Sequence, residues 1–245
     1  MNGWARAARL RPYVRQAHAD WRGPWFIENR RLMDYLLVYI DQGTGLFSID
    51  GRAFDVGPGD LIWFPPNTLH EMRGHPPKMR VLHIHFDLLY DPVRSARARI
   101  PNPGERDLGA DSRWIHRPLR DPVIDAWRGK LPIVNGAAIH ALIRQLCVES
   151  ISARDPFLSA GLLLQIIGEI ERGLSLGATR AGIRWPALQR AAEEILSQSG
   201  SALDISALAQ RAHLSVSHFR RLFREVHKKA RASSTTRRAH RRPAR

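Results

Sequence analysis

Short apolar runs separated by turn residues are the feature that most limits what this chain can fold into. Between residues 36 and 86 each run is too short for a buried helix, and Gly, Pro, Asn or Asp residues interrupt the chain between them. Asp50-Gly51 adds a hairpin signal, because this pair suits a type I′ turn. We expect strands over residues 36–40, 46–54 (two strands with that turn between them), 61–64, 70–73 and 81–86. Such spacing predicts an antiparallel sandwich or a small barrel.

Helical periodicity replaces the strand pattern after residue 136. Residues 137–153 repeat apolar side chains at helical spacing, and residues 157–172 are apolar over more than half of a helix circumference. Such a helix must be covered by the β-structure on one side and by something else on the other. Core packing and a homodimer interface are the two alternatives. For residues 91–131 we expect loops, with a closing strand around Trp114-Ile115.

Residues 204–226 have the pattern of two helices joined by a tight turn. Asp204 and Ser215 can each cap the start of a helix, because their side-chain oxygens accept free backbone N–H groups there. Each helix carries an apolar stripe at i, i+3, i+4 and i+7, and Leu214 in the turn can fill the space between them. With a supporting helix at 187–199, this pattern is typical of a helix-turn-helix unit.

The outer face of the second helix carries Ser217, Arg220, Arg221 and Arg224. The planar fork of an arginine can pair with O6 and N7 of guanine or with a phosphate. A plain solvated surface is the alternative interpretation of these arginines. The two caps and the matching apolar stripes favour a DNA-reading face.

Charge and composition point to the same class of partner. The net charge of +15 favours a polyanion, nucleic acid first and an acidic membrane surface second. Eight of these excess charges lie in residues 227–245, which leaves +7 for the rest of the chain. The sequence has no signal-peptide pattern and no run of ~18 apolar residues. Because Cys147 is the single cysteine, the chain has no internal disulfide framework. Its apolar neighbours predict that Cys147 is a small buried core residue. We therefore expect a cytoplasmic protein without a membrane segment or cofactor.

Residues 56–70, VGPGDLIWFPPNTLH, resemble the second half of a cupin barrel: a Pro-Gly-Asp turn, a strand, a proline and a histidine. Metal-binding cupins have further histidines on an earlier strand pair, but no histidine occurs between His18 and His70. His70 with His83 and His85 could form a different triad suited to Zn, Fe or Ni, because residues 83 and 85 share one face of a strand. We favour pocket-lining histidines and no metal. The expected effector pocket contains Tyr39, Trp63, His70, His83 and His85.

The order of the parts resembles the AraC family of bacterial transcription regulators. The resemblance covers residues 15–90 loosely and residues 186–226 closely. Its specific part is LA…LSxSHFRRLF in residues 208–223, which is similar to the family's first helix-turn-helix nearly position by position. The resemblance implies a small-molecule effector in the cupin-like domain and a homodimer through the helical pair. It also implies that Ser217, Arg220 and Arg221 contact base edges, with His218 and Arg224 nearer the phosphates of double-stranded DNA.

The sequence departs from the family after Val226. Family members continue with a Gly, a Ser-Pro, a linker helix and a second helix-turn-helix, whereas this chain continues with a basic tail of disordered composition. A frameshift or truncation would produce such a tail. Three alternatives to an effector-controlled regulator stay open. They are a metal-dependent cupin enzyme, a non-specific nucleic-acid binder acting through the tail, and a chain whose N-terminal domain alone folds, senses or dimerises.

We therefore predict an α+β protein that is not an enzyme: a cupin-like antiparallel β-barrel, a helical pair and a partial all-α helix-turn-helix domain. The predicted segments are an N-terminal arm (1–20), a cupin-like effector domain (21–131), dimerisation helices (132–173), a linker (174–185), a partial helix-turn-helix domain (186–226) and a disordered basic tail (227–245). The predicted function is sequence-specific DNA binding under the control of the effector.

Overall fold

The computed structural model describes residues 3–176, 205–211, 216–217 and 219–221. The chain divides into two compact units, the first ending at Ser175 and the second beginning at Leu176.

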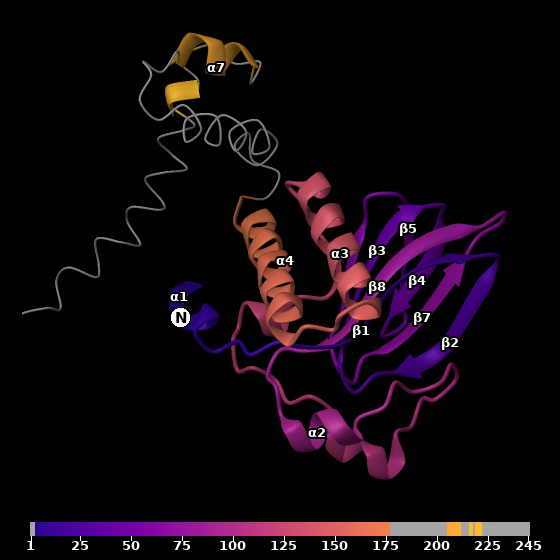
Figure 1. The fold of residues 1–245 in the computed structure, drawn as a ribbon. Helices are drawn as coiled ribbons and strands as arrows, with labels where there is room; N and C mark the ends of the chain where they lie inside the picture. The colour runs from indigo at the N-terminus through magenta and orange to yellow at the C-terminus, as the bar shows by residue number, and fades with distance from the viewer. Residues whose placement is uncertain (1–2, 177–204, 212–215, 218, 222–245) are drawn as a thin grey trace, which may run out of the picture. The chain divides into compact units, whose positions relative to one another are not determined.

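Two antiparallel sheets and a pair of helices make up the first unit (Figure 1). The larger sheet has the order β1-β8-β3-β6-β9, with β1 at Tyr13–Arg22, β3 at Tyr35–Gln42, β6 at Leu61–Phe64, β8 at Met79–Asp87 and β9 at Gly129–Leu131. The smaller sheet has the order β2-β7-β4-β5, with β2 at Trp25–Arg31, β4 at Gly45–Ile49, β5 at Arg52–Val56 and β7 at Leu69–Gly74. The helices are α1 (Gly3–Ala7), α2 (Pro92–Arg97), α3 (Gly136–Ile151) and α4 (Pro156–Leu176), with 3₁₀ turns η1 (Gly109–Trp114) and η2 (Ile124–Ala126). The predicted antiparallel sandwich followed by a helical pair is confirmed.

Strand β3 is buried on both faces, which explains its unbroken apolar run. Because side chains alternate across a strand, Leu37 and Tyr39 point into a core shared with the helices. Leu36 and Val38 point the other way, into a second core between the two sheets. The larger sheet therefore has an apolar core on each face: an outer core against the helices and an inner core against the smaller sheet. Only the inner core borders the space between the two sheets.

The β4–β5 hairpin forms where the sequence predicts it. Asp50 and Gly51 have φ angles of 47° and 79°, the positive values that both central residues of a type I′ turn require. The turn sets the register, so that Phe47 lies opposite Phe54 and Ile49 opposite Arg52.

The helical pair covers the outer face of the larger sheet. Asn135 caps α3 by accepting a hydrogen bond from the Ala138 backbone N–H at 3.2 Å. Helix α3 lies against β1, β8 and β3. Buried side chains of both helices, including Leu146 and Ile166, join the outer core. Cys147 is also buried there, and burial raises the pKa of its thiol to about 12. Its predicted place as a small core residue is confirmed.

The prediction of an N-terminal arm over residues 1–20 is wrong, because much of this stretch forms strand β1. This strand pairs with β8 along nearly its whole length, and Ala17 in its middle is fully buried. Arg15 pairs with the buried carboxylates of Asp34 and Asp87. A basic residue that looked like part of a solvated arm is therefore an internal ion-pair partner.

The prediction of a strand around Trp114-Ile115 is also wrong. Trp114 ends the 3₁₀ turn η1, and both residues pack on a small cluster of Met33, Ala98 and Leu108. The sheet is closed instead by β9, which pairs with β6.

Helix α4 extends four residues beyond the predicted end at residue 172. Gly173 permits this, because its missing Cβ lets the helix lie directly against the Pro132 carbonyl. The predicted linker, 174–185, therefore begins inside the helix, and its remainder lies outside the described residues.

In the second unit, helix α7 spans Ile205–Arg211, and residues 216–217 and 219–221 are helical. Ala209 is buried and Phe219 is 2% exposed, whereas Ser217, Arg220 and Arg221 are exposed. The supporting helix expected at 187–199, Leu214 and the tail 227–245 lie outside the described residues.

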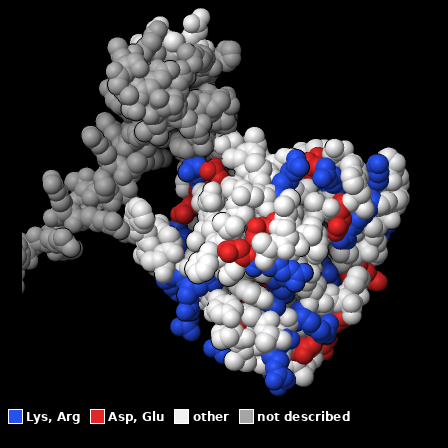
Figure 2. Space-filling view, viewed as in Figure 1, with Lys and Arg blue, Asp and Glu red and all other residues white. Residues whose placement is uncertain are grey.

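Figure 2 shows that basic and acidic side chains are interspersed over one face of the first unit. None of the helices that the structure describes is long and apolar enough to cross a membrane.

Candidate functional site

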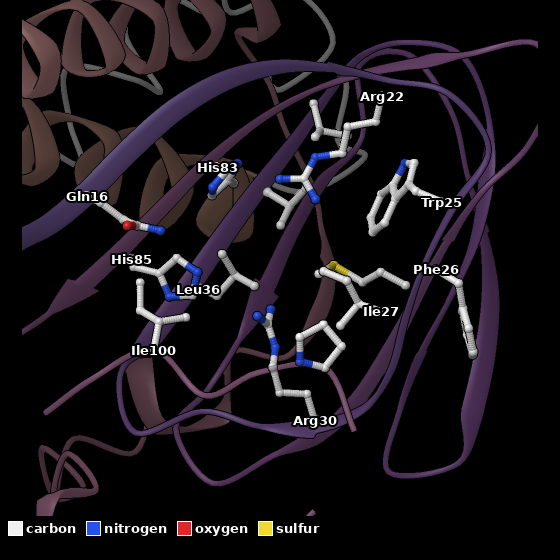
Figure 3. Close-up of a pocket in the computed structure, with 14 residues that line it drawn as sticks. Gln16, Arg22, Trp25, Phe26, Ile27, Arg30, Leu36, His83, His85 and Ile100 are labelled. Carbon is white, nitrogen blue, oxygen red and sulfur yellow. The ribbon is translucent and has the colours of Figure 1, made fainter. Parts of the chain in front are cut away.

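A cavity of about 350 Å³ lies between the two sheets (Figure 3). The residues that line it belong to four parts of the fold: strand β1, strand β2, the inner faces of β3, β7 and β8, and the loop after α2. These residues are Gln16 and Arg22; Trp25, Phe26, Ile27 and Arg30; Leu36, Val38, Met72, Val81, His83 and His85; and Ile100 and Pro103. The size and the mainly apolar lining are those of a small-molecule site.

The apolar wall follows from strand alternation. Leu36 and Val38 on β3, Val81 on β8 and Met72 on β7 all belong to the core between the sheets. Their side chains continue from that core to the cavity surface. This wall can bind the apolar part of a ligand but offers it no hydrogen bonds.

Two arginines face the cavity. Arg30, near the end of β2, is only 6% exposed, and its Nε donates to Nε2 of His70 at 3.3 Å. Its Nη1 donates to the Pro101 carbonyl at 3.4 Å. Burial lowers the pKa of Arg30 to about 10, so it stays charged at neutral pH. Arg22 forms an ion pair with Asp20 at 2.9 Å.

Histidines 83 and 85 share the inner face of β8, with ring centroids 6.0 Å apart. Burial lowers the pKa of His83 to about 3, helped by repulsion from His85, so its imidazole is neutral. The Nδ1 atom of His85 lies 3.2 Å from a carboxylate oxygen of Asp34. A neutral imidazole can both donate and accept a hydrogen bond, so the part of the cavity formed by the two histidines can bind a hydroxyl or a carboxyl oxygen.

Only two of the five predicted pocket residues line the cavity, His83 and His85. His70 lies behind Arg30, where burial and the arginine charge lower its pKa to about 3. Tyr39 and Trp63 are on the opposite face of the sheet: Tyr39 stacks on His140 of α3 at 5.3 Å, and Trp63 packs in the outer core. Their assignment to the pocket was wrong, because the odd-numbered positions of β3 and β6 face the helices.

The lining residues from β1 and β2 were not predicted from the sequence, among them Gln16, Arg22, Trp25 and Arg30. Residues 1–30 read as a basic arm, so no strand face could be assigned to them. The nearest indication of a strand in the sequence was the group of aromatic residues near the end of this stretch.

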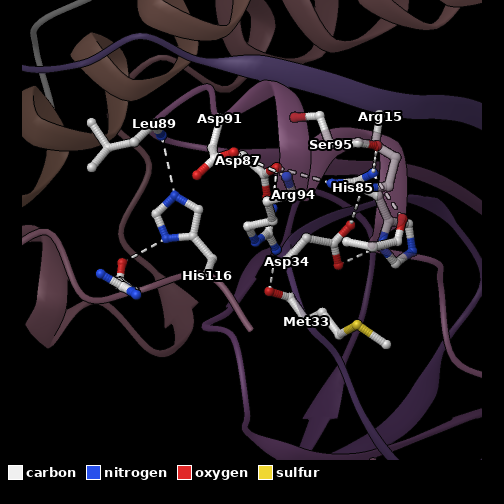
Figure 4. Close-up of polar contacts among 12 residues, drawn as sticks. Arg15, Met33, Asp34, His85, Asp87, Leu89, Asp91, Arg94, Ser95 and His116 are labelled. Atoms are coloured by element: carbon white, nitrogen blue, oxygen red, sulfur yellow. Dashed lines mark hydrogen bonds and ion pairs between the residues drawn. The ribbon is translucent and has the colours of Figure 1, made fainter. Parts of the chain in front are cut away.

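Behind His85 a buried polar network fixes the cavity wall (Figure 4). Arg15 bridges the Asp34 and Asp87 carboxylates at 3.2 and 2.9 Å, and it also donates to the Ala98 carbonyl after α2 at 3.0 Å. Arg94 of α2 is the second partner of Asp87. Burial raises the pKa of Asp87 to about 6, against the opposing effect of both arginines. The network holds Asp34, and through it His85, in a fixed position.

No group of three His, Cys, Asp or Glu side chains within the described ranges is placed to hold a metal ion. The alternative triad of His70, His83 and His85 is therefore not formed. His70 Nε2 accepts a hydrogen bond from Arg30 and its Nδ1 lies 3.3 Å from the Thr68 carbonyl oxygen, so both ring nitrogens already have protein partners.

The predicted DNA-binding residues lie in the second unit. Ser217, Arg220 and Arg221 are exposed on the helical segment whose Phe219 is buried. His218 and Arg224 lie outside the described residues.

Several solved structures resemble part of the chain. Vicilin from hazelnut (Corylus avellana) matches at 20% identity over 29% of this chain and 25% of that chain, with a TM-score of 0.26. A variant of Bacillus subtilis oxalate decarboxylase matches at 21% identity over 31% of this chain and 22% of that chain, also with a TM-score of 0.26. A cupin superfamily protein from Desulfitobacterium hafniense matches at 15% identity over 32% of this chain and 77% of that chain, with a TM-score of 0.27. The matched part thus spans about a quarter of the vicilin and decarboxylase chains. No curated protein matches the sequence.

A protein-family model matches far more of the chain. The model described as the AraC-like ligand binding domain matches residues 13–167, from the start of β1 into α4. This span contains both sheets, every residue that lines the cavity, and α3. It is more than half of the chain, and the chain therefore belongs to the AraC-like ligand-binding domain family.

Proposed function

We propose that this chain is a transcription regulator of the AraC type, in which an effector in the cavity between the sheets controls DNA binding by the second unit. The observation that carries the proposal is the family match over residues 13–167 together with the cavity that lies within it. Membership of this family implies that the domain binds a small-molecule effector. A coupling of ~1–3 kcal/mol between effector and DNA sites is the usual scale for such control.

DNA contact is proposed for the helical segment from residue 216. Its buried Phe219 and exposed Ser217, Arg220 and Arg221 support the amphipathic pattern of the sequence motif. We assign base contacts to those three exposed residues, and phosphate contacts to His218 and Arg224. An arginine that pairs with a guanine through two hydrogen bonds contributes ~1–3 kcal/mol of discrimination between bases.

Homodimerisation is proposed through the helical pair. Val148 and Ile151 at the end of α3, and Phe157 and Leu158 at the start of α4, are exposed apolar side chains joined by a short connection. Apolar side chains clustered at one end of two helices are typical of a protein interface.

Selection from a random DNA pool, with the full chain and with residues 227–245 deleted, tests the proposal against a non-specific binder. We expect both proteins to enrich the same sequence, and the deletion to weaken mainly the salt-sensitive affinity for random DNA. If no sequence is enriched, or if enrichment disappears with the tail, the chain is not a sequence-specific regulator by this helix.

Substitution of Arg221 by Ala tests base reading directly. We expect binding to the selected site to weaken by ~1–3 kcal/mol, and binding to random DNA to weaken much less, in gel-shift titrations. Arg52→Ala is the matched control, because Arg52 is an exposed arginine on β5 of the first unit. Equal losses on both DNAs would show that Arg221 contacts only phosphate.

A further inference from the structure

The cavity contains a buried positive charge that lacks a carboxylate partner among the described residues. Arg30 contacts a neutral imidazole, that of His70, and a backbone carbonyl. The carboxylates whose fields act on it, Asp34 and Glu105, are paired with other arginines: Asp34 with Arg15 at 3.2 Å, and Glu105 with Arg99 at 2.6 Å.

Burying Arg30 without an opposite charge is costly for the fold. A buried ion without an opposite charge loses its hydration and gains little in return. Arg22 faces the same cavity, and its charge adds to the lowering of the Arg30 pKa (Figure 3). An anion bound beside Arg30 would relieve both the missing hydration and the repulsion between the two guanidinium groups.

The charges around the cavity indicate how many negative charges the ligand carries. Arg22 already pairs with Asp20, and burial keeps His83 neutral. Arg30 is therefore the cavity-lining cation that still lacks an opposite charge. One negative charge balances it, whereas a phosphate dianion would bring an excess.

We infer, on the basis of the proposed function, that the effector is a small organic monocarboxylate whose carboxylate pairs with Arg30 and whose apolar body lies against Leu36, Val38 and Met72. The planar guanidinium fork matches the two oxygens of a carboxylate. The apolar wall suits a hydrocarbon chain or an aromatic ring. A sugar, by contrast, has hydroxyls all round its ring and would place some of them against Leu36, Val38 and Met72, which cannot bond them.

Binding of matched acids and amides to the full chain tests the inference. The probes are benzoate, phenylacetate, cinnamate and octanoate, each with its primary amide, together with glucose and inorganic phosphate. Calorimetry and tryptophan fluorescence report binding, the latter because Trp25 lines the cavity. We expect at least one acid to bind about ten-fold or more tighter than its amide, because the amide lacks the charge that pairs with Arg30.

Arg30→Gln provides the second arm, with Arg52→Gln as the control. Arg30→Gln should abolish the preference for the acid over its amide, and Arg52→Gln should keep it. The acid–amide comparison in the unmodified chain decides the question even if Arg30→Gln fails to fold. Absence of acid preference in every pair, a preference for glucose or phosphate, or an unchanged preference in folded Arg30→Gln would overturn the inference.

Failure of the inference is distinguishable from failure of the proposed function. The selection of DNA sequences by the same protein is measured without any ligand, so its result does not depend on which ligand binds. Selected DNA with a neutral preferred ligand would overturn only the carboxylate inference. Acid-selective binding without any enriched DNA would overturn only the proposed regulation.

Discussion

Trp63 is a structural residue of the outer core, and its removal should cost stability. Its ring contacts Trp127 and Phe86 edge-on, each at 5.2 Å between centroids. We expect Trp63→Ala to lower the free energy of unfolding by about 3–5 kcal/mol, the usual loss for a buried large aromatic residue, in urea titrations. Trp21→Ala is the control, because Trp21 is 48% exposed, and it should cost about 1 kcal/mol or less. Similar losses in both variants would contradict the burial of Trp63.

The fate of single residues shows what a sequence can say about a pocket. Residue alternation placed His83 and His85 on one face of a strand, and both line the cavity. The same rule could not tell which face of β3 and β6 meets the cavity, because both faces are apolar and buried, and Tyr39 and Trp63 were misplaced for that reason. Arg30 gave no signal, because a buried arginine and a surface arginine look alike in sequence.

The exposed apolar end of the helical pair gives a prediction at the level of an element. Phe157, at the start of α4, is 86% exposed, and we expect Phe157→Ser to shift the protein from dimer toward monomer, because it removes an aromatic anchor from the proposed interface. Sedimentation velocity at several concentrations measures the change. Val93→Ser on α2 is the control, because Val93 is 61% exposed but lies outside the helical pair, and it should leave the association unchanged. A monomeric parent protein would contradict the proposed interface.

Elements were predictable where local chemistry dominates. The β4–β5 hairpin follows from its Asp-Gly turn, and the helices α3 and α4 follow from apolar periodicity. Strand β9 was missed because its three residues carry too little pattern. Strand β1 was missed because its polar side chains become buried only through ion pairs with residues far along the chain, which no local pattern reveals.

At the level of the whole first unit, the interior carries ionisable groups whose charge state depends on the fold. His70, His83 and His116 lie in three different parts of it, and burial is the main cause that lowers their pKa values to about 3, 3 and 4. Asp87 behaves oppositely, because burial raises its pKa to about 6. Folding therefore changes the number of bound protons, and stability must depend on pH.

The three histidines should make the unit lose stability in mild acid. The unfolded chain binds protons at these sites below their ordinary pKa of 6.5, but the folded chain does not until pH 3–4, so stability falls as the pH drops from 6.5 to 4. Each histidine contributes up to about 1.4 kcal/mol per pH unit. Between pH 6 and 3.8 Asp87 offsets one of the three, because the folded chain holds its proton more tightly there than the unfolded chain does.

Urea unfolding at stepped pH, followed by tryptophan fluorescence, measures this dependence, since six of the seven tryptophans lie in residues 3–176. His83→Gln should reduce the slope between pH 6.5 and 4 by about one proton, because a neutral amide replaces an imidazole that takes up a proton on unfolding. Above pH 7 the unfolding free energies of variant and parent should run parallel, because neither form of the site titrates there. A flat profile below pH 6.5, or a stability that rises toward pH 4, would contradict the neutral state of these buried imidazoles.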